Sequence, residues 1–397
     1  MEFAPWPFFS DDEIQAVVNV LKSGKINQWT GEEVRAFEKE FAAYIGISHA
    51  VALANGSLAL DMALAALDVG KDDEVIVAPR SFVASAGCVG LRGAVPVFVD
   101  VDPISQNMTV DSISQAVTSK TKAVIAVNLA GWPCDLVSIK SFCEQKNLFL
   151  IEDCAQAHGA AFESKKVGSF GDCAVFSFCQ DKIITTGGEG GMLVTNRADI
   201  WKKVWSFKDH GKDYDKAFCQ KHDPGFKWLI NSFGTNARMT EMQAAMGCVM
   251  LKKLDAWVKK RRTYADQLNQ AFANMPGLRT TIPGPACYHS YYKYYVFIDQ
   301  DALNGAWNRD RVVDALNNAG IPCNTGICPE IYKEKAFNKG NCRIQGAAKD
   351  SSGKNYLPVA RKLGETSVMF MVHPTLTPAS MGYVIDQMQK IMKKAVS

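Results

Sequence analysis

The sequence lacks paired cysteines. Its 397 residues include 12 cysteines, scattered singly, and no two of them form a C-x-x-C pair. Cys323 and Cys328 are close neighbours but have no second ligand pair. The spacing therefore argues against a zinc site and a disulfide framework. We predict no metal site, and we expect mostly small buried thiols in a reducing compartment.

The sequence also lacks a large excess of positive or negative charge, and it lacks long apolar runs. The 44 basic and 41 acidic residues leave a net charge of +3, which does not favour binding to nucleic acid or membranes. No apolar run approaches the length of a membrane span. The first residues, Met1 to Trp6, lack the basic start and apolar core of a signal peptide. We therefore expect a cytoplasmic protein with no nucleic-acid or membrane partner.

What the sequence has is an alternation of short apolar, β-rich runs with amphipathic stretches. The runs are 75–78, 95–99, 123–127, 148–151 and 174–176, and the stretches between them include 57–67, 81–91 and 136–145. This order predicts an α/β fold with a mostly parallel sheet covered on both faces. Ligands of such sheets bind at the carboxyl ends of the strands, where Asp153 and Ser177 fall.

The pattern changes after Arg238. A long helix is predicted from Thr240 toward Leu268, a strand at 294–298, and helices near 309–319 and from Pro378 toward Lys393. We interpret residues 1–250 as a large domain and residues 251–397 as a smaller C-terminal α+β domain. The polar, glycine-bearing segment 338–354 is predicted to be an exposed loop.

Lys182 is the first candidate for chemistry. It follows the apolar run around Phe176, with Ser177 five residues before it and the glycine cluster 187–191 after it. A lysine amine can form a Schiff base with an aldehyde, and burial and neighbouring charge tune it. Taken alone, a lysine is more often a solvated surface residue, so its surroundings carry the argument. The glycine cluster precedes a strand and is not G-x-G-x-x-G, which favours a turn over a dinucleotide site.

Asp153 is the second of two acidic residues that follow the apolar run 148–151. A carboxylate at this place could hold a protonated pyridine nitrogen, or it could cap the next helix. Gln156 and His158 follow, and could hydrogen-bond a ring hydroxyl, orient the acid or cap local backbone.

Asn55-Gly56-Ser57 is typical of a turn that leads into a helix. The free amides of that turn and the Ser57 hydroxyl could bind an anion, although a simple capping serine fits equally. Ser177 is a second candidate phosphate ligand. Phe82 could stack on a cofactor ring, whereas an isolated phenylalanine more often belongs to the core.

Together these motifs resemble the DegT/DnrJ/EryC1/StrS family of sugar aminotransferases, over nearly the whole chain. Five segments match the family's motifs in order: the turn at Gly56, then 79–84, 152–159, 177–191, and Gly234 to Ala245. The resemblance implies the aspartate-aminotransferase fold (fold type I) of pyridoxal-phosphate (PLP) enzymes. We therefore expect a large domain built on a seven-stranded, mostly parallel sheet.

The resemblance also implies roles for single residues. Lys182 would bind the cofactor aldehyde covalently and move protons. The pyridine nitrogen would be held by Asp153, the ring hydroxyl by Gln156 and the ring face by Phe82. The phosphate ligands would be Gly56, Ser57, Leu58 (through its backbone) and Ser177, joined by Asn236 of a second subunit. A homodimer with shared active sites follows.

The function implied is transfer of an amino group from L-glutamate to a nucleotide-linked keto-sugar, for a surface polysaccharide such as a lipopolysaccharide O-antigen or for a secondary metabolite. A cyclitol aminotransferase is the alternative, and a non-catalytic PLP-binding regulator is the hypothesis from another class. A sugar dehydratase of the same family would carry histidine in place of Lys182. Three positions depart from the family pattern: the extra glycine after Thr186, Ala237, and Tyr292 where a second histidine is usual.

Overall fold

The computed structural model describes residues 1–337 and 340–397. At its centre is a sheet in the order β1-β9-β8-β5-β4-β2-β3-β14. Neighbouring strands are parallel, except that β9 runs antiparallel to both β1 and β8. The strands are β1 (His49–Leu53), β2 (Glu74–Val77), β3 (Val95–Phe98), β4 (Thr121–Val127), β5 (Phe149–Asp153), β8 (Cys173–Ser177), β9 (Gly191–Thr195) and β14 (Arg343–Ile344).

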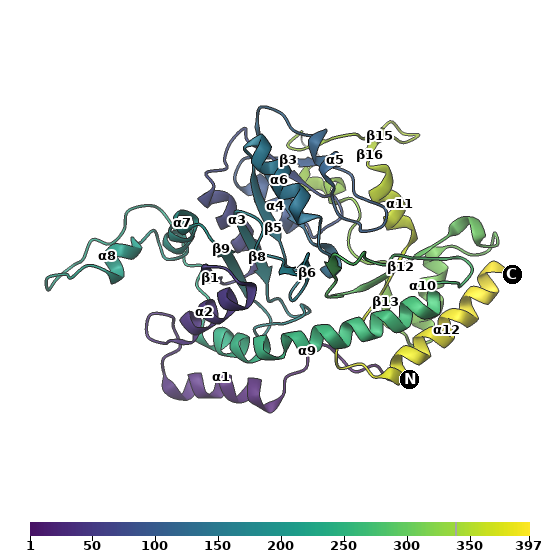
Figure 1. The fold of residues 1–397 in the computed structure, drawn as a ribbon, viewed down its shortest axis with the longest axis horizontal. Helices are drawn as coiled ribbons and strands as arrows, with labels where there is room; N and C mark the ends of the chain where they lie inside the picture. The colour runs from purple at the N-terminus through teal and green to yellow at the C-terminus, as the bar shows by residue number, and fades with distance from the viewer. Residues whose placement is uncertain (338–339) are drawn as a thin grey trace.

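Helices surround this sheet (Figure 1). Every residue of β2, β8 and β9 is buried, as expected for the inner strands of a sheet that is covered on both faces. The helices of this region are α2 (Glu33–Ile45), α3 (Gly56–Ala66), α4 (Ala84–Leu91), α5 (Val110–Ser114), α6 (Leu136–Lys146) and α7 (Ala198–Lys208). The predicted α/β fold with a mostly parallel sheet is confirmed.

A second, antiparallel sheet lies in the C-terminal part, in the order β10-β12-β17-β13. Its strands are β10 (Leu278–Thr280), β12 (Tyr294–Ile298), β13 (Cys323–Asn324) and β17 (Ser367–Phe370), and its helices are α10 (Arg309–Asn318), α11 (Pro358–Thr366) and α12 (Pro378–Val396). Helix α9 (Glu241–Phe272) supplies Leu254 to the core of the large sheet and Leu268 to a separate C-terminal core. The domain division at residue 250 stays a prediction.

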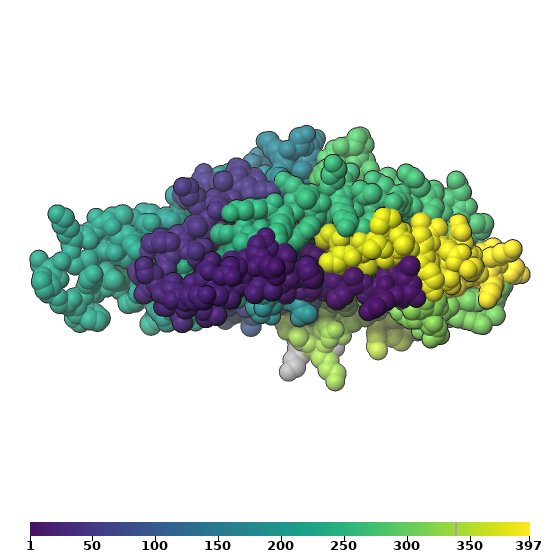
Figure 2. Space-filling view, turned by 90° about the horizontal axis from the view of Figure 1, so that it is seen from below, coloured from purple at the N-terminus to yellow at the C-terminus, as the bar shows by residue number. Residues whose placement is uncertain are grey.

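The N-terminal segment ties these two parts together. Helix α1 (Asp11–Ser23) lies along α9, where Lys253 Nζ contacts Asp12 at 2.7 Å and Glu13 at 2.6 Å. The residues before α1 reach the C-terminal helix α12, where the Phe3 and Tyr383 rings lie 6.4 Å apart. Figure 2 shows this purple segment across the lower face of the molecule, beside the green of α9 and the yellow of α12.

Between α7 and α9 an arm containing α8 (Tyr214–Phe218) projects from the body of the molecule (Figure 1). Phe226, Trp228 and Phe233 on this arm are 77%, 78% and 98% exposed. Aromatic side chains gathered on one exposed segment are typical of a surface that another chain covers.

Segment 338–354 differs from the predicted loop, as far as the structure describes it; residues 338–339 lie outside the described residues. Strand β14 extends the sheet by pairing in parallel with β3, so the sheet has eight strands rather than seven. Arg343 holds it there through two hydrogen bonds to Glu74, at 3.0 and 3.1 Å. The next residues form a hairpin of β15 (Ala348–Lys349) and β16 (Asn355–Tyr356). Two-residue strands leave no periodic signal in a sequence.

The remaining strands β6 (Ala161–Phe162), β7 (Lys165–Lys166) and β11 (Cys287–Tyr288) form a small sheet in the order β11-β6-β7. Within residues 1–337 and 340–397, no helix combines the length and the apolarity needed to span a bilayer.

Candidate active site

A cavity of about 670 Å³ opens at the carboxyl ends of β4, β5 and β8, beside residues of the C-terminal sheet. Seven of the nine residues that the sequence predicted as ligands or catalyst line it: Gly56, Ser57, Phe82, Asp153, Gln156, Ser177 and Lys182. Leu58 and Asn236 do not line it. Parallel strands place their carboxyl ends at one edge of the sheet, which is why residues 120 positions apart meet here.

The start of α3 forms one wall of the cavity. The Asn55 side chain caps this helix by accepting the Leu58 N–H at 2.9 Å, so that amide is already engaged. The preceding amides at the helix start have no partner within the helix, and Gly56 lies next to Ser177. A Cβ on Gly56 would lie 2.8 Å from the Ser177 Cβ. Glycine therefore allows this close approach of α3 to β8, and the two together form a cradle for an anion.

Asp153 lies on the floor of the cavity, at the end of β5, and is 5% exposed. The Ser85 hydroxyl donates to Oδ2 at 2.7 Å, and the Ala155 N–H donates to Oδ1 at 3.1 Å. Burial raises the pKa of this carboxyl, while those hydrogen bonds and the charge of Lys182 oppose the rise. Among the residues that the structure describes, no basic nitrogen lies within 4.0 Å of it. A buried carboxylate of this kind is stabilised by a cation.

Gln156 and His158 have separate surroundings. The Gln156 Oε1 accepts the Ala130 N–H at 2.8 Å, which leaves the NH₂ end of this side chain as its donor toward the cavity. His158 does not line the cavity; it packs between the rings of Phe176 and Phe178, with centroids 5.4 and 5.6 Å away. Burial lowers its pKa to about 3, so His158 is a neutral core residue.

Lys182 reaches the cavity from the loop after β8, with a side chain that is 16% exposed. Its Nζ lies 3.9 Å from the Asp181 carboxylate and 4.9 Å from the centre of the Tyr292 ring. The backbone of Lys182 is held from the other end of the chain, because the Trp6 indole N–H donates to its carbonyl oxygen at 2.9 Å. The position of this amine is therefore set by three separate parts of the chain.

Phe82 is the exposed member of the set. Its ring is 61% exposed although it lines the cavity. The turn that carries it precedes α4, which begins at Ala84 rather than at the predicted residue 81. A phenylalanine at a cavity mouth, without a packing partner on its outer face, is suited to stack on a bound ring.

Several residues of the site escaped the sequence reasoning. Ser85 is one helical turn after Ser81, and their hydroxyl oxygens lie 2.7 Å apart; that i, i+4 spacing of serines beside Phe82 could have indicated it. Tyr292, which departs from the family pattern, and Lys293 directly precede β12 of the C-terminal sheet, and the Tyr292 hydroxyl donates to Asp181. No local sequence pattern predicts that Lys293 belongs to the site.

Four other polar residues, Lys208, His210, His289 and Tyr291, do not line this cavity. Lys208 is fully buried and pairs with Glu38 at 3.2 Å. The rings of His289 and Tyr291 stack at 3.8 Å beneath the loop after β4. His210 belongs to the base of the arm.

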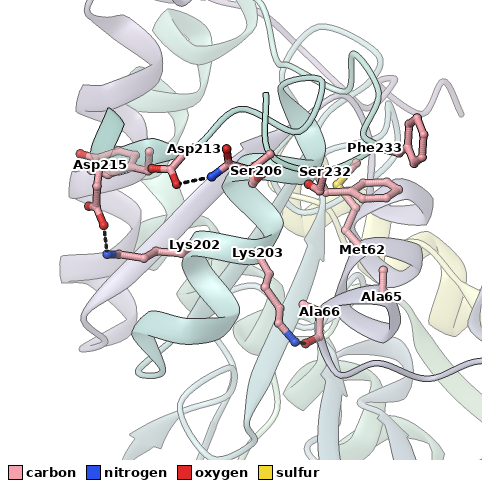
Figure 3. A pocket seen from close by; sticks show the side chains of 13 residues that line it. Met62, Ala65, Ala66, Lys202, Lys203, Ser206, Asp213, Asp215, Ser232 and Phe233 are labelled. Atoms are coloured by element: carbon pink, nitrogen blue, oxygen red, sulfur yellow. Dashed lines mark hydrogen bonds and ion pairs between the residues drawn. The ribbon is translucent and has the colours of Figure 1, made fainter. Parts of the chain in front are cut away.

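A smaller cavity of about 340 Å³ lies at the base of the arm (Figure 3). It is walled by the end of α3, by α7 and by the arm, and Lys202 pairs there with Asp215 at 2.6 Å. It contains none of the residues that the sequence predicted for the site. The larger cavity is therefore the candidate active site.

The groups that line the larger cavity are suited to bind a phosphorylated pyridine aldehyde. The cradle at Gly56 suits a phosphate, the uncompensated carboxylate of Asp153 suits a protonated ring nitrogen, and the exposed face of Phe82 suits an aromatic ring. The primary amine of Lys182 lies in the same cavity and suits the aldehyde.

Known proteins resemble this chain along its whole length. The DegT/DnrJ/EryC1/StrS aminotransferase family matches residues 8–389. The X-ray structure of an aminotransferase from Psychrobacter cryohalolentis is 45% identical, with a TM-score of 0.95 over 100% of both chains. GDP-perosamine synthase from Caulobacter vibrioides is 38% identical over 293 residues, which are 73% of this chain and 75% of that protein. L-glutamine:2-deoxy-scyllo-inosose aminotransferase from Streptoalloteichus tenebrarius is 36% identical over 384 residues, 92% of this chain and 89% of that one.

Proposed function

Because this chain belongs to the DegT/DnrJ/EryC1/StrS aminotransferase family and is a pyridoxal-phosphate-dependent enzyme, we propose that it moves the amino group of L-glutamate to a nucleotide-linked keto-deoxysugar. The product would be an amino sugar for a surface polysaccharide or a secondary metabolite, made in the cytoplasm. The observation that carries the proposal is one cavity holding an amine, a buried carboxylate and an anion cradle. Since family membership makes the chain an aminotransferase, the non-catalytic regulator is not retained.

The cofactor supplies an aldehyde that condenses with amines and a ring that withdraws electrons from the bond to be broken. Asp153 would keep the ring nitrogen protonated, Gln156 would donate to the ring hydroxyl, and Phe82 would cover the ring. Ser57 and Ser177 would hold the phosphate. These contacts fix the reacting centre against Lys182.

Lys182 would act as general base and then as general acid. Its Nζ would take the proton from the α-carbon of the donor, and in the second half of the reaction it would deliver a proton to the sugar carbon that receives the amine. The Trp6 contact to its backbone and the nearby Asp181 carboxylate restrict where this amine can move.

The test is the near-visible absorption spectrum of the purified enzyme, before and after L-glutamate. We expect the band of the lysine-bound cofactor to give way to that of the aminated cofactor, and a nucleotide-linked keto-sugar to restore the first band. A cofactor band that no amino acid alters would contradict the proposal. A 2-deoxy-scyllo-inosose type ketone that restores the band where nucleotide sugars fail would favour the cyclitol alternative, in keeping with the relative that carries that name.

We also propose that the enzyme is a homodimer in which Asn236 completes the site of the partner subunit. Asn236 does not line the cavity of its own chain, and it lies at the base of the arm, where its backbone bridges to Asp209. The arm itself carries the exposed Phe226 and Trp228. Asn236→Ala should weaken cofactor binding about 10-fold, the cost of a hydrogen bond to a charged phosphate. The measurement is titration of the apoenzyme with cofactor, read by tryptophan fluorescence.

Mixing subunits gives the control for shared sites. Dimers formed from Lys182→Ala and Asn236→Ala subunits should contain one site with both wild-type residues, and should bind cofactor there with wild-type affinity. An Asn236→Ala enzyme with unchanged affinity, or a monomer in sedimentation analysis, would contradict the shared site.

A further inference from the structure

The mechanism leaves one buried cation of the active-site cavity without a role. Lys293 immediately precedes β12 and lines the cavity, with a side chain that is 13% exposed. An ammonium group has three N–H donors. The Lys293 Nζ donates to the Met371 sulfur at 3.2 Å, and the nearest Asp181 oxygen lies 3.6 Å away, beyond hydrogen-bond distance. Its hydrogen-bonding capacity is thus poorly met by the residues that the structure describes.

The charges around Lys293 are unbalanced. Its one carboxylate, Asp181, also lies 3.9 Å from Lys182 and accepts the Tyr292 hydroxyl. Arg261 packs behind Tyr292, donates to the Tyr292 carbonyl oxygen at 3.2 Å, and has its Nε and one Nη without a partner. Two ammonium groups therefore share one half-exposed carboxylate, and a third cation, Arg261, lies behind the same Tyr292. Desolvated cations in such surplus are stabilised by an anion that enters the cavity.

The position of Lys293 narrows the kind of anion. The Nζ atoms of Lys182 and Lys293 lie within 4 Å of the same Asp181 carboxylate and on the same Tyr292 ring, at 4.9 and 4.6 Å. Lys182 must reach the α-carbon of the amino donor to remove its proton. The anionic group bonded directly to that carbon is the α-carboxylate, which an amine next to Lys182 is suited to bind.

We infer that Lys293 is the binding residue for the α-carboxylate of the amino donor. This inference rests on the proposed function, because it requires an amino acid as donor. A salt-bridged hydrogen bond between an ammonium and a carboxylate orients the donor so that its α-hydrogen points to Lys182. Tyr292 and Asp181 would keep the lysine in place while no donor is bound.

The test uses the holoenzyme and equilibrium binding rather than turnover. The first probe is 2-methyl-L-glutamate, which binds through its amine but has no α-hydrogen and cannot give that amine up. The second is 4-aminobutyrate, which keeps the amine and the distal carboxylate and lacks the α-carboxylate. Both are titrated against the absorption band of the bound cofactor. Lys293→Met should weaken 2-methyl-L-glutamate about 10- to 100-fold, as expected for loss of a charged hydrogen bond, and leave 4-aminobutyrate within about twofold.

Lys390→Met is the matched control, since Lys390 also pairs with an aspartate, at 2.7 Å, but on the exposed surface of α12. It should change neither affinity. Lys293→Gln, which keeps a polar group at the cavity, replaces the methionine variant if that one loses its cofactor. Unchanged binding of 2-methyl-L-glutamate, equal loss for both probes, or a loss confined to the sugar acceptor would overturn the inference. Because neither probe requires amino transfer, these outcomes are distinct from a failure of the enzyme to aminate a sugar.

Discussion

Replacing Lys182 with alanine is expected to lower the rate of amino transfer at least about 10⁴-fold, the upper range for loss of a positioned general base that also binds covalently. The other lysine that lines the cavity, Lys293, is not expected to take over this role, because its amine is held between Asp181 and Met371. The folded structure should survive the substitution. Among the described residues, the Lys182 side chain makes no hydrogen bond, and its ion pair with Asp181 is long, at 3.9 Å.

The measurement is a single turnover with L-glutamate, followed by the cofactor band, together with the melting temperature. Lys390→Ala, an exposed lysine on α12, is the control for the substitution itself and should behave as wild type. The absorption band of the covalent lysine linkage should be missing in Lys182→Ala. A variant that keeps this band and normal turnover would show that another residue carries the chemistry.

Asp153→Asn is expected to lower the rate of amino transfer at least about 10²-fold, because it removes a preorganised charge that stabilises the protonated ring. The asparagine has the same shape and can still accept the Ser85 hydroxyl, which now reaches Oδ2 at 2.7 Å. The change therefore tests charge rather than packing.

The stability of the apoenzyme tests whether Asp153 serves to bind the cofactor or to stabilise the fold. Its carboxyl is buried and its pKa is raised by that burial, with no basic nitrogen within 4.0 Å among the described residues. Without cofactor, removing this charge should leave the melting temperature unchanged or higher, because an uncompensated buried carboxylate is costly. With cofactor, the variant should lose most of the stabilisation that ligand binding gives the wild type. An apoenzyme destabilised by Asp153→Asn would indicate a purely structural carboxylate.

The prediction of the fold succeeded where the pattern was long and local. The apolar runs that became β2, β3, β4, β5 and β8 were found within a few residues, and the periodic helix from Thr240 was found as α9. The eighth strand was missed because β14 has two residues, and its place depends on Arg343 contacting Glu74, 269 positions away.

The site divides in the same way. The chain order of Gly56, Asp153, Ser177 and Lys182 indicated a cofactor site. The first three begin or end a regular element and Lys182 lies in the loop after β8, so local sequence places all four at the sheet edge. The residues that restrict Lys182 carry no such signal. Trp6 contacts its backbone across 176 positions, and Tyr292 reaches Asp181 across 111.

By itself, then, the sequence determined the α/β class and the family resemblance, and it predicted a cofactor-binding set of which seven residues line one cavity. Turns, strand ends and their order are local properties of the chain. Tertiary structure alone decided that Lys182 is approached by Trp6 and Tyr292, and that Lys293 faces the same cavity with an unbalanced charge. The physical reason is that burial and the sharing of charges are set by segments that meet only when the C-terminal sheet and the N-terminal segment pack against the large sheet. A residue's neighbours along the chain do not report those contacts.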